Sequence, residues 1–511
     1  MNNVHIAVDL GASGGRVALG GISDGRLGVE IVHRFVNAPV SVPTPQGPRL
    51  YWDVLGLWRE ILFGIRLAGE RATVLGAEVS SIGVDSWAVD YALLDGYGLL
   101  LDGVHSYRDS RTEGLMDGAF KTVPPSEMYE HTGVQFLPFN TLYQLLAVKR
   151  DAPGLLERTS TLLLVPDLLH YWLSGVAVCE RTNASTTQFY DPRSRNWSEF
   201  MLETFGIPSA VLPEIVDPGT VLGPLREELT LELGLSTNVM VVATGTHDTA
   251  SAVAAVPMAA NDDRCAYISS GTWSLVGLEL PEPILSGEAM AADITNEAGL
   301  NDTTRFLKNV MGLWILQECR RAWTPSSAAT ARRKSDPPEA RELEWAQIYQ
   351  EAESAPAFRC FIDPDHHRFL SPGLDMPDRV YQHCLDTNQN PPLSMGEIAR
   401  CILESLALKY RVVIEKLGKV SGRSVRRIHI VGGGALVAIL CQMTANATGC
   451  EVIAGPVDAT LTGNLLVQCE TMGELEPDQR REVVRKSVDL LRYEPREVMA
   501  WSSAFDRFKK L

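Results

Sequence analysis

The chain has 511 residues, of which 45% are hydrophobic, so it can bury a sizeable core and divide into two or more domains. This composition excludes a disordered or fibrous protein. The formal net charge of −17 disfavours a general binder of nucleic acid or of anionic membranes, because most of such a surface repels phosphate.

The nine cysteines are scattered and form no CxxC pair, so they indicate small core residues in a reducing compartment rather than a zinc site. The first fifteen residues lack a basic start, and Asp9 interrupts their apolar stretch, so they do not resemble a secretory signal. We therefore expect a cytoplasmic protein with no membrane or nucleic-acid partner, present as a monomer or a small homo-oligomer.

Near the N-terminus, an apolar run from Val4 to Leu10 leads into the sequence DLGASGGR (9–16), and apolar residues resume at 17–19. This pattern predicts a hairpin with a Gly/Ser tip. The pattern recurs at 266–278 around SSGT (269–272). Two similar hairpins indicate two domains of related build.

Further strands are predicted at 81–84, 161–165, 239–243 and 427–431, with helical periodicity over 55–67 and 398–417 between them. Such alternation is typical of α/β layers. We expect domains at 1–245 and 246–480, and a helical extension at 481–511. The segment from Thr324 to Arg341 is rich in Ser, Pro and charge, which predicts an exposed, mobile loop.

The DLGASGGR hairpin has the residue types of a phosphate site. Asp9 can hold Mg2+ through water, while the backbone of Gly11 to Gly15 and the cation Arg16 face phosphoryl oxygens. An ordinary Gly-rich hairpin with an exposed salt bridge explains the same residues equally well. The SSGT tip alone favours a plain turn, although its similarity to the first hairpin favours a second phosphate clamp.

The motif GTHDTAS (245–251) follows the strand at 239–243 and places His247 and Asp248 before a helix predicted from Thr249 to Val256. A carboxylate there can accept a proton from a hydroxyl nucleophile. An Asp N-cap, which needs no substrate, is the structural alternative.

Three weaker patterns remain. The VGGG turn (431–434) makes room for a flat group such as adenine, although a strand-to-helix turn also uses glycine. At SWAVD (86–90), Trp87 lies between the carboxylates of Asp85 and Asp90, which suits a sugar, although a half-buried Trp is also common in a core. His366 and His367 lack a third ligand, which favours a solvated loop over a metal site.

Together these motifs resemble the FGGY family of carbohydrate kinases over nearly the whole chain. The stretches that carry the resemblance are VDLGASGGRVAL, YWDV (51–54), SIGVDSWAVD, YRDSRT (107–112), GVQFLPFNTLYQL (133–145), LLVPDLLHYWLSG, TNASTTQ (182–188), THDTASAV, YISSGTWSL, ITNEAG, LKNVMGLWILQ (307–317), HIVGGG and IAGPVDAT (453–460).

The resemblance implies an actin-like ATPase fold with two ribonuclease-H-like α/β domains and an active site in the cleft between them. It also implies transfer of the ATP γ-phosphoryl group, with Mg2+, to the C1 hydroxyl of L-rhamnulose. Matched motif by motif, Asp248 is the catalytic base. The implied sugar contacts are Ala88, His247, Asp248, Thr249 and Asn309. The implied ATP contacts are Ala12, Ser13, Gly14, Gly15, Arg16, Thr272, Gln317, Gly433 and Gly434.

Three positions depart from the family pattern. Ala88 replaces a glycine beside the sugar, Leu436-Val437 replaces a polar pair after VGGG, and Asp458 replaces a glutamate. The first change bears on which ketose is used, so L-fuculose and L-xylulose are alternatives. The other two bear on nucleotide affinity. A non-catalytic sugar sensor is the alternative from another functional class.

Overall fold

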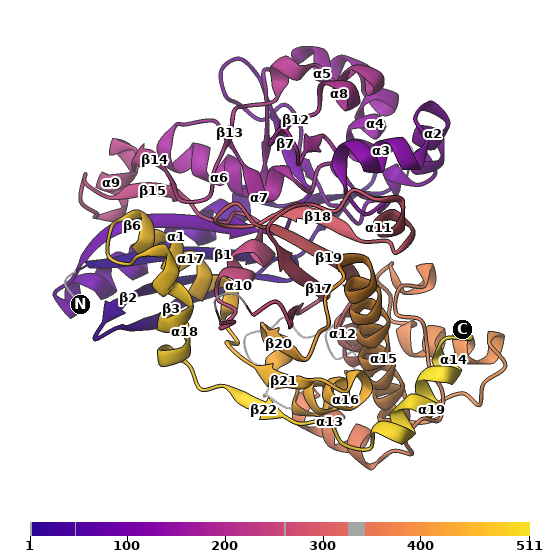
Figure 1. The fold of residues 1–511 in the computed structure, drawn as a ribbon. Coiled ribbons are helices and arrows are strands. Elements are labelled where there is room, and N and C mark those ends of the chain that lie inside the picture. The colour runs from indigo at the N-terminus through magenta and orange to yellow at the C-terminus, as the bar shows by residue number, and fades with distance from the viewer. Residues whose placement is uncertain (1–2, 46, 260–261, 325–342) are drawn as a thin grey trace, which may run out of the picture. The chain divides into compact units, whose positions relative to one another are not determined.

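The computed structural model describes residues 3–45, 47–259, 262–324 and 343–511. The chain forms two compact units (Figure 1). Unit 1 comprises Met1–Asp262, Gly277–Lys308 and Asp458–Asp489, and unit 2 comprises Asp263–Val276, Asn309–Val457 and Leu490–Leu511. The loop predicted at 324–341 lies, beyond Thr324, outside the described residues.

Unit 1 is built on a six-stranded sheet of mixed direction, in the order β14-β15-β6-β1-β2-β3. Its strands are β14 (Thr220–Pro224), β15 (Met240–Ala243), β6 (Glu78–Ser86), β1 (Asn3–Gly11), β2 (Gly14–Ser23) and β3 (Arg26–Val36). The strands β1, β6 and β15 run parallel, whereas β1, β2 and β3 form an antiparallel meander. The predicted N-terminal hairpin is confirmed.

The central strand β1 is buried on both faces, which explains why its sequence is almost continuously apolar instead of alternating. Helix α1 (Val54–Leu75) and helix α6 (Val165–Ser174) contribute residues to the same core. The segment predicted as a strand at 161–165 divides into the short strand β9 (Thr161–Leu164) and the start of α6, since Pro166 fits the first turn of a helix.

The other elements of unit 1 are short. Its small sheets contain β4 (Val40–Val42), β5 (Arg49–Trp52) and β8 (Val104–His105); β7 (Tyr91–Leu94) and β9; β10 (Cys179–Glu180) and β13 (Ile215–Val216); and β11 (Tyr190–Asp191) and β12 (Asn196–Trp197). Its remaining helices are α2 (Leu115–Thr122), α3 (Pro125–Thr132), α4 (Thr141–Asp151), α5 (Pro153–Arg158), α7 (Arg181–Ala184), α8 (Glu199–Phe205), α9 (Glu227–Leu233), α10 (Asp248–Ala254), α11 (Gly287–Ala291), α17 (Ala459–Thr471) and α18 (Arg480–Ser487), with the 3-10 turns η1 (Ser110–Thr112), η2 (Ser209–Val211) and η6 (Pro477–Gln479).

Unit 2 contains the parallel strands β16 (Cys265–Ser270), β20 (Arg427–Val431) and β21 (Glu451–Ala454), with β22 (Leu491–Tyr493) antiparallel at the edge. The second predicted hairpin is present, because β17 (Trp273–Leu280) follows β16 after a tight turn. The helices are α12 (Trp314–Trp323), α13 (Trp345–Ser354), α14 (Met376–Asp386), α15 (Met395–Ser421), α16 (Ala438–Thr448) and α19 (Val498–Phe508), with η4 (His367–Phe369) and η5 (Gly433–Leu436).

The strand β18 (Thr295–Ala298) pairs in antiparallel register with the first half of β19 (Thr304–Met311) inside unit 1. Both β17 and β19 continue along the chain from one unit into the other. No helix in the described part of the chain combines the length and the apolar character that a membrane crossing needs.

The two compact units are interleaved along the chain, and the expected domains at 1–245, 246–480 and 481–511 stay a prediction. Contacts of helix α17 explain why a late segment of the chain belongs to unit 1. Gln468 Nε2 donates to the Ile6 carbonyl of β1 at 3.0 Å, and Asn464 Nδ2 donates to the Gly83 carbonyl of β6 at 3.3 Å. These hydrogen bonds attach the late segment to the N-terminal sheet, where Figure 1 shows α17 in yellow among indigo strands.

Candidate active site

The parallel strands of unit 1 bring three predicted functional segments to one edge of the sheet. Asp9 on β1 lies in register with Asp85 on β6, and Ser86 forms a parallel bridge with His247. Carboxyl ends of adjacent parallel strands meet at the same edge, which is where α/β folds place ligand sites. The candidate metal residue Asp9 and the motif that contains Asp248 therefore share this edge.

Asp85 is a further candidate site residue, which the sequence analysis noted only as a carboxylate beside Trp87. Burial raises the pKa of its carboxyl well above the ordinary value, and the neighbouring charge of Asp9 raises it further. Asn464 Nδ2 donates to Asp85 Oδ2 at 2.6 Å, which opposes this shift. The charge of Asp248 also acts on Asp85, so three carboxylates are electrostatically coupled here. An Asp directly before the predicted SWAVD motif was the available signal.

The predicted phosphate loop carries an ion-pair network. Arg16 donates through both Nε and a terminal nitrogen to Asp9 Oδ2, and its other terminal nitrogen contacts Asp458 Oδ1 at 2.5 Å. A salt bridge within the hairpin is thus present, but it is largely buried and not exposed as the structural alternative expected, and the network links β1 and β2 to the segment before α17. Asp458 stands where the family has a glutamate, and its shorter side chain still reaches Arg16.

The glycines of this loop also have a packing role. A Cβ at Gly15 would lie 2.2 Å from the Phe35 ring, and one at Gly14 would lie 3.1 Å from the Phe35 carbonyl oxygen. Ala12 is partly buried and Ser13 is exposed at the tip. Packing against β3 alone therefore accounts for Gly15, while the tip at Ala12 and Ser13 remains open to solvent.

Asp248 is the first residue of α10, and the N-cap position belongs to His247. The structural alternative, in which Asp248 caps the helix, is therefore wrong. Thr249 Oγ1 donates to Asp248 Oδ1 at 3.1 Å, and His247 Nε2 lies 3.4 Å from the same oxygen. Burial raises the pKa of Asp248 and the charge of Asp9 adds to the rise, whereas His247 opposes it. A carboxyl with a raised pKa is better matched to accept a proton.

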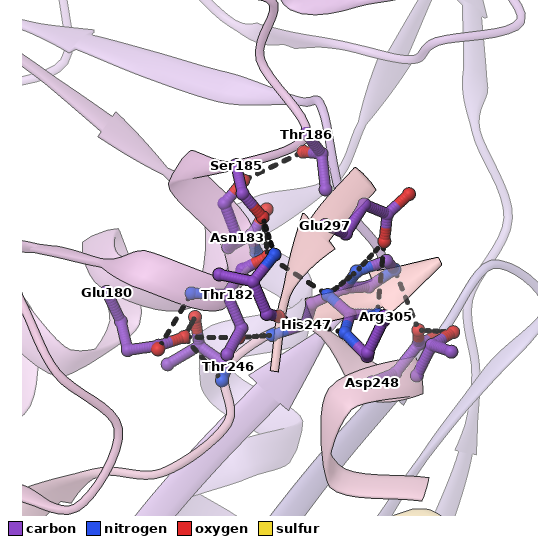
Figure 2. Close-up of polar contacts among 12 residues, drawn as sticks. Glu180, Thr182, Asn183, Ser185, Thr186, Thr246, His247, Asp248, Glu297 and Arg305 are labelled. Atoms are coloured by element: carbon purple, nitrogen blue, oxygen red, sulfur yellow. Dashed lines mark hydrogen bonds and ion pairs between the residues drawn. The ribbon is translucent and has the colours of Figure 1, made fainter. Parts of the chain in front are cut away.

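His247 is held on its other side by a buried ion pair, shown in Figure 2. Arg305 on β19 is fully buried, and one of its terminal nitrogens lies 3.2 Å from His247 Nδ1. The other terminal nitrogen lies 3.1 Å from Glu297 Oε2 on β18. Glu297 Oε2 is also 3.3 Å from His247 Nδ1. Neither charged residue was singled out from the sequence.

A second network holds the loop before His247 (Figure 2). The Glu180 carboxylate is fully buried and accepts from the backbone N–H and the hydroxyl of both Thr182 and Thr246. The Thr182 hydroxyl in turn accepts from the His247 backbone N–H at 3.3 Å. Burial raises the pKa of Glu180, and these four hydrogen bonds oppose the rise. The motif TNASTTQ, which starts at Thr182, was recognised in the sequence. The sequence did not indicate that Thr182 contacts Glu180.

The SWAVD segment divides into a core part and an accessible part. Trp87 is 5% exposed, and its Nε1 donates to Asp90 Oδ2 at 3.0 Å. Asp90 also accepts from Trp52 Nε1 at 2.6 Å, and burial raises its pKa to about 6 against these hydrogen bonds. The indole N–H of Trp87 and the carboxylate of Asp90 are thus hydrogen-bonded to each other in the core. Ala88 is partly exposed, and Val89 after it has a φ of 68°.

The remaining predicted contacts belong to unit 2. Thr272 Oγ1 donates to Gln317 Oε1 at 3.4 Å, so these two predicted ATP contacts lie together. A Cβ at Gly434 would lie 2.0 Å from Ser270 Oγ, whereas one at Gly433 would meet open space. Close packing on β16 therefore accounts for Gly434, and Gly433 is open to a ligand. Leu436 is 70% exposed. Asn309 lies on β19, in the half that belongs to unit 2.

All nine cysteines are buried and unpaired in the structure, as expected of core residues. Cys360, Cys384 and Cys401 nevertheless lie together in a group that could hold a metal ion, which the absence of a CxxC pair did not predict. His366 caps the η4 turn by accepting from the Arg368 backbone N–H at 3.3 Å, and its ring lies 4.2 Å from that of His367. Within the described ranges, neither histidine belongs to a group of three potential metal ligands.

Comparison with known proteins identifies the family. Residues 4–255 match the model of the N-terminal domain of the FGGY family of carbohydrate kinases, and residues 266–472 match that of its C-terminal domain. The chain is 38% identical over 510 residues to a rhamnulokinase of Bacteroides thetaiotaomicron, covering 100% of this chain and 99% of the relative. It is 40% identical over 509 residues to a rhamnulokinase of Pectobacterium atrosepticum, covering 99% and 96%.

Solved structures support the same fold. A gluconate kinase from Lactobacillus acidophilus superposes with a TM-score of 0.77 at 16% identity, over 99% of this chain and 97% of that chain. A glycerol kinase of Plasmodium falciparum with ADP gives a TM-score of 0.73 at 15% identity, over 99% and 98%. The expected two-domain α/β kinase fold is confirmed. The chain belongs to the FGGY family of carbohydrate kinases.

Proposed function

We propose that this sugar kinase transfers the γ-phosphoryl group of ATP to the C1 hydroxyl of L-rhamnulose. The observation that carries the proposal is the Asp248 carboxylate, which lies beside His247 at the same sheet edge as Asp9. The names of the full-length relatives, which are rhamnulokinases, support the choice of L-rhamnulose.

Asp248 acts as the base that accepts the proton of the attacking hydroxyl. Phosphoryl transfer leaves little covalent chemistry to the protein, so a positioned carboxylate and electrostatic stabilisation of the phosphates are its main contributions. The raised pKa of Asp248 brings its carboxylate nearer to the basicity that this role requires.

The sugar contacts follow from this placement. His247 and Thr249 flank the base in sequence and in space, since both side chains contact Asp248. Ala88 lies two residues after the end of β6, and Ser86 at that end forms a bridge with His247. Asn309 is proposed as a further sugar contact on the basis of the family motif.

The proposed nucleotide contacts lie on the two predicted hairpins, on helix α12 and in the VGGG turn. The loop tip from Ala12 to Arg16 would bind phosphate through exposed backbone N–H groups and the Arg16 guanidinium. Thr272, Gln317 and the open face at Gly433 would complete the ATP contacts, and Gly434 allows the close turn beside them.

Magnesium fits the residues at the sheet edge. Asp9 and Asp85 present carboxylate oxygens, the ligands that this cation prefers, and Asp85 Oδ1 has no hydrogen-bond partner among the described residues. We propose that Asp9, through water, and Asp85 would hold Mg2+. When bound, Mg2+ would neutralise charge on the ATP phosphates.

A coupled ADP-release assay over a panel of ketoses tests the function. We expect L-rhamnulose to give the highest kcat/KM, followed by L-fuculose and then L-xylulose. A higher kcat/KM for either alternative would reassign the substrate. A sensor would bind sugar without releasing ADP, so the absence of ADP with every ketose would overturn the kinase assignment.

A further inference from the structure

Three contacts hold the Arg305 guanidinium in addition to its hydrogen bond with His247. Its Nε donates to the Ala298 carbonyl of β18 at 2.9 Å, and one terminal nitrogen donates to the Thr182 carbonyl of α7 at 3.2 Å. The ion pair with Glu297 holds the other terminal nitrogen. With these contacts and no solvent exposure, the guanidinium has one defined orientation (Figure 2).

This orientation constrains the proton position on His247. An arginine guanidinium carries only donors and stays charged, so a ring nitrogen that bonds to it must present a lone pair. The hydrogen bond at His247 Nδ1 comes from Arg305, and the contact of Nδ1 with Glu297 is an ion-pair distance. The proton of the neutral ring therefore belongs on Nε2, which lies 3.4 Å from Asp248 Oδ1.

We propose that Arg305 is a positioning residue that keeps His247 in the neutral Nε2–H tautomer. The Nε2–H group then faces Asp248 and the space in front of it. There it donates to Asp248 or to a sugar oxygen, and it orients the carboxylate for proton transfer. The link to turnover rests on the proposed function, whereas the tautomer is a property of the free protein.

If the ion pair between Arg305 and Glu297 has only a structural role, a different result is expected. Removal of such a pair lowers stability, but it leaves the histidine tautomer and the balance of KM and kcat unchanged. The ion pair between buried Arg480 and partly buried Glu470 in the same unit, with Nε and Oε1 3.2 Å apart, provides a control.

The direct test is nitrogen-15 NMR of histidine-labelled free protein. The chain has ten histidines, and the His247 signals are identified as those missing from His247→Asn. We expect the Nε2–H tautomer in the wild type and in Glu297→Gln. Arg305→Gln, which retains an N–H donor, should keep this tautomer, whereas Arg305→Met should lose it. A wild-type Nδ1–H tautomer at His247 would overturn the proposal whatever the Arg305 and Glu297 variants do.

Kinetics separate positioning from stability. For Arg305→Met we expect the KM for L-rhamnulose to rise by about tenfold and kcat to fall, with the KM for ATP within about twofold. Arg305→Gln should recover much of this loss, and Arg480→Met should change only the thermal midpoint. Equal kinetic effects of Arg305→Met and Arg480→Met would refute the positioning role. If the wild type turned over none of the ketoses, the proposed function would fail while the NMR result would still decide the tautomer.

Discussion

Asp9 and Asp85 occupy the same register position in the adjacent parallel strands β1 and β6, so two carboxylates lie side by side near the proposed base Asp248. A sheet places equivalent positions of neighbouring strands only a few ångströms apart, and like charges there are unfavourable. Such a cluster is costly for folding and useful for binding a cation.

The free energy of unfolding of Asp85→Asn, relative to that of the wild type, should increase as the pH rises. The folded-state pKa of Asp85 lies above the value of about 3.9 for an unfolded aspartate, so the native protein retains a proton that the unfolded chain releases. Stability of the wild type therefore falls as pH rises between these two values, and the variant lacks this loss. Urea unfolding from about pH 3.5 to pH 7 measures the difference.

Asp489→Asn is the control, because this aspartate is exposed. Its stability should follow that of the wild type at every pH. A stability difference between Asp85→Asn and the wild type that does not change with pH would contradict the electrostatic account.

Asp248→Asn should reduce kcat by about 10²-fold or more while sugar binding largely survives, because the amide keeps the shape but accepts no proton. Steady-state kinetics and sugar titration calorimetry measure the two effects. Turnover close to that of the wild type would remove Asp248 from the role of base.

The raised pKa of Asp248 also predicts the acidic limb of the wild-type pH profile. The base acts as a carboxylate, so kcat should fall as pH decreases through a value above the ordinary aspartate pKa of about 3.9. A kcat that stays constant down to about pH 4 would show that no such base controls turnover.

Glu180→Gln should weaken the loop that carries His247. The amide NH2 group faces the Thr182 backbone N–H in one orientation, and the donors of Thr182 and Thr246 in the other. At least one hydrogen bond is therefore replaced by opposed donors, and we expect a loss of about 1–3 kcal/mol in unfolding free energy. We also expect kcat/KM for the sugar to fall by about tenfold or more. Denaturation and steady-state kinetics measure these changes.

The KM for ATP provides the internal control for Glu180→Gln, because the predicted ATP contacts of unit 2 belong to another part of the fold. It should stay within about twofold of the wild type. A parallel loss of ATP and sugar affinity would indicate general disruption of the protein instead of a local effect at His247.

Ala88→Gly should leave the preference for 6-deoxyketoses in place. If the Ala88 methyl group lies beside the sugar, as proposed, its hydrophobic contact with the C6 methyl contributes on the order of 1 kcal/mol, or roughly fivefold in affinity. We therefore expect the KM for L-rhamnulose to change by less than about tenfold, with similar kcat. Measurements of kcat/KM for three ketoses with both variants test this, and L-xylulose as the best wild-type substrate would refute it.

Local patterns in the sequence predicted the parts of this protein that depend on neighbours along the chain. Both Gly/Ser hairpins were visible because apolar runs flank small polar tips, and the strand before GTHDTAS ends where the pattern indicates. The placement of Asp9 near the end of a strand and of Asp248 at the start of a helix was also readable, since strand periodicity and turn residues act over short distances.

The tertiary structure alone decided which distant charges meet. Asn464 reaches Asp85, Asp458 reaches Arg16, and Glu180 joins Thr246, although long stretches of chain separate each pair. In a sequence with 63 acidic and 46 basic residues, no local rule selects these partners, because a buried charge is satisfied by whichever group the fold brings within hydrogen-bond distance. For the same reason Arg305 and Glu297 became visible around His247 only once β18 and β19 had been placed beside it.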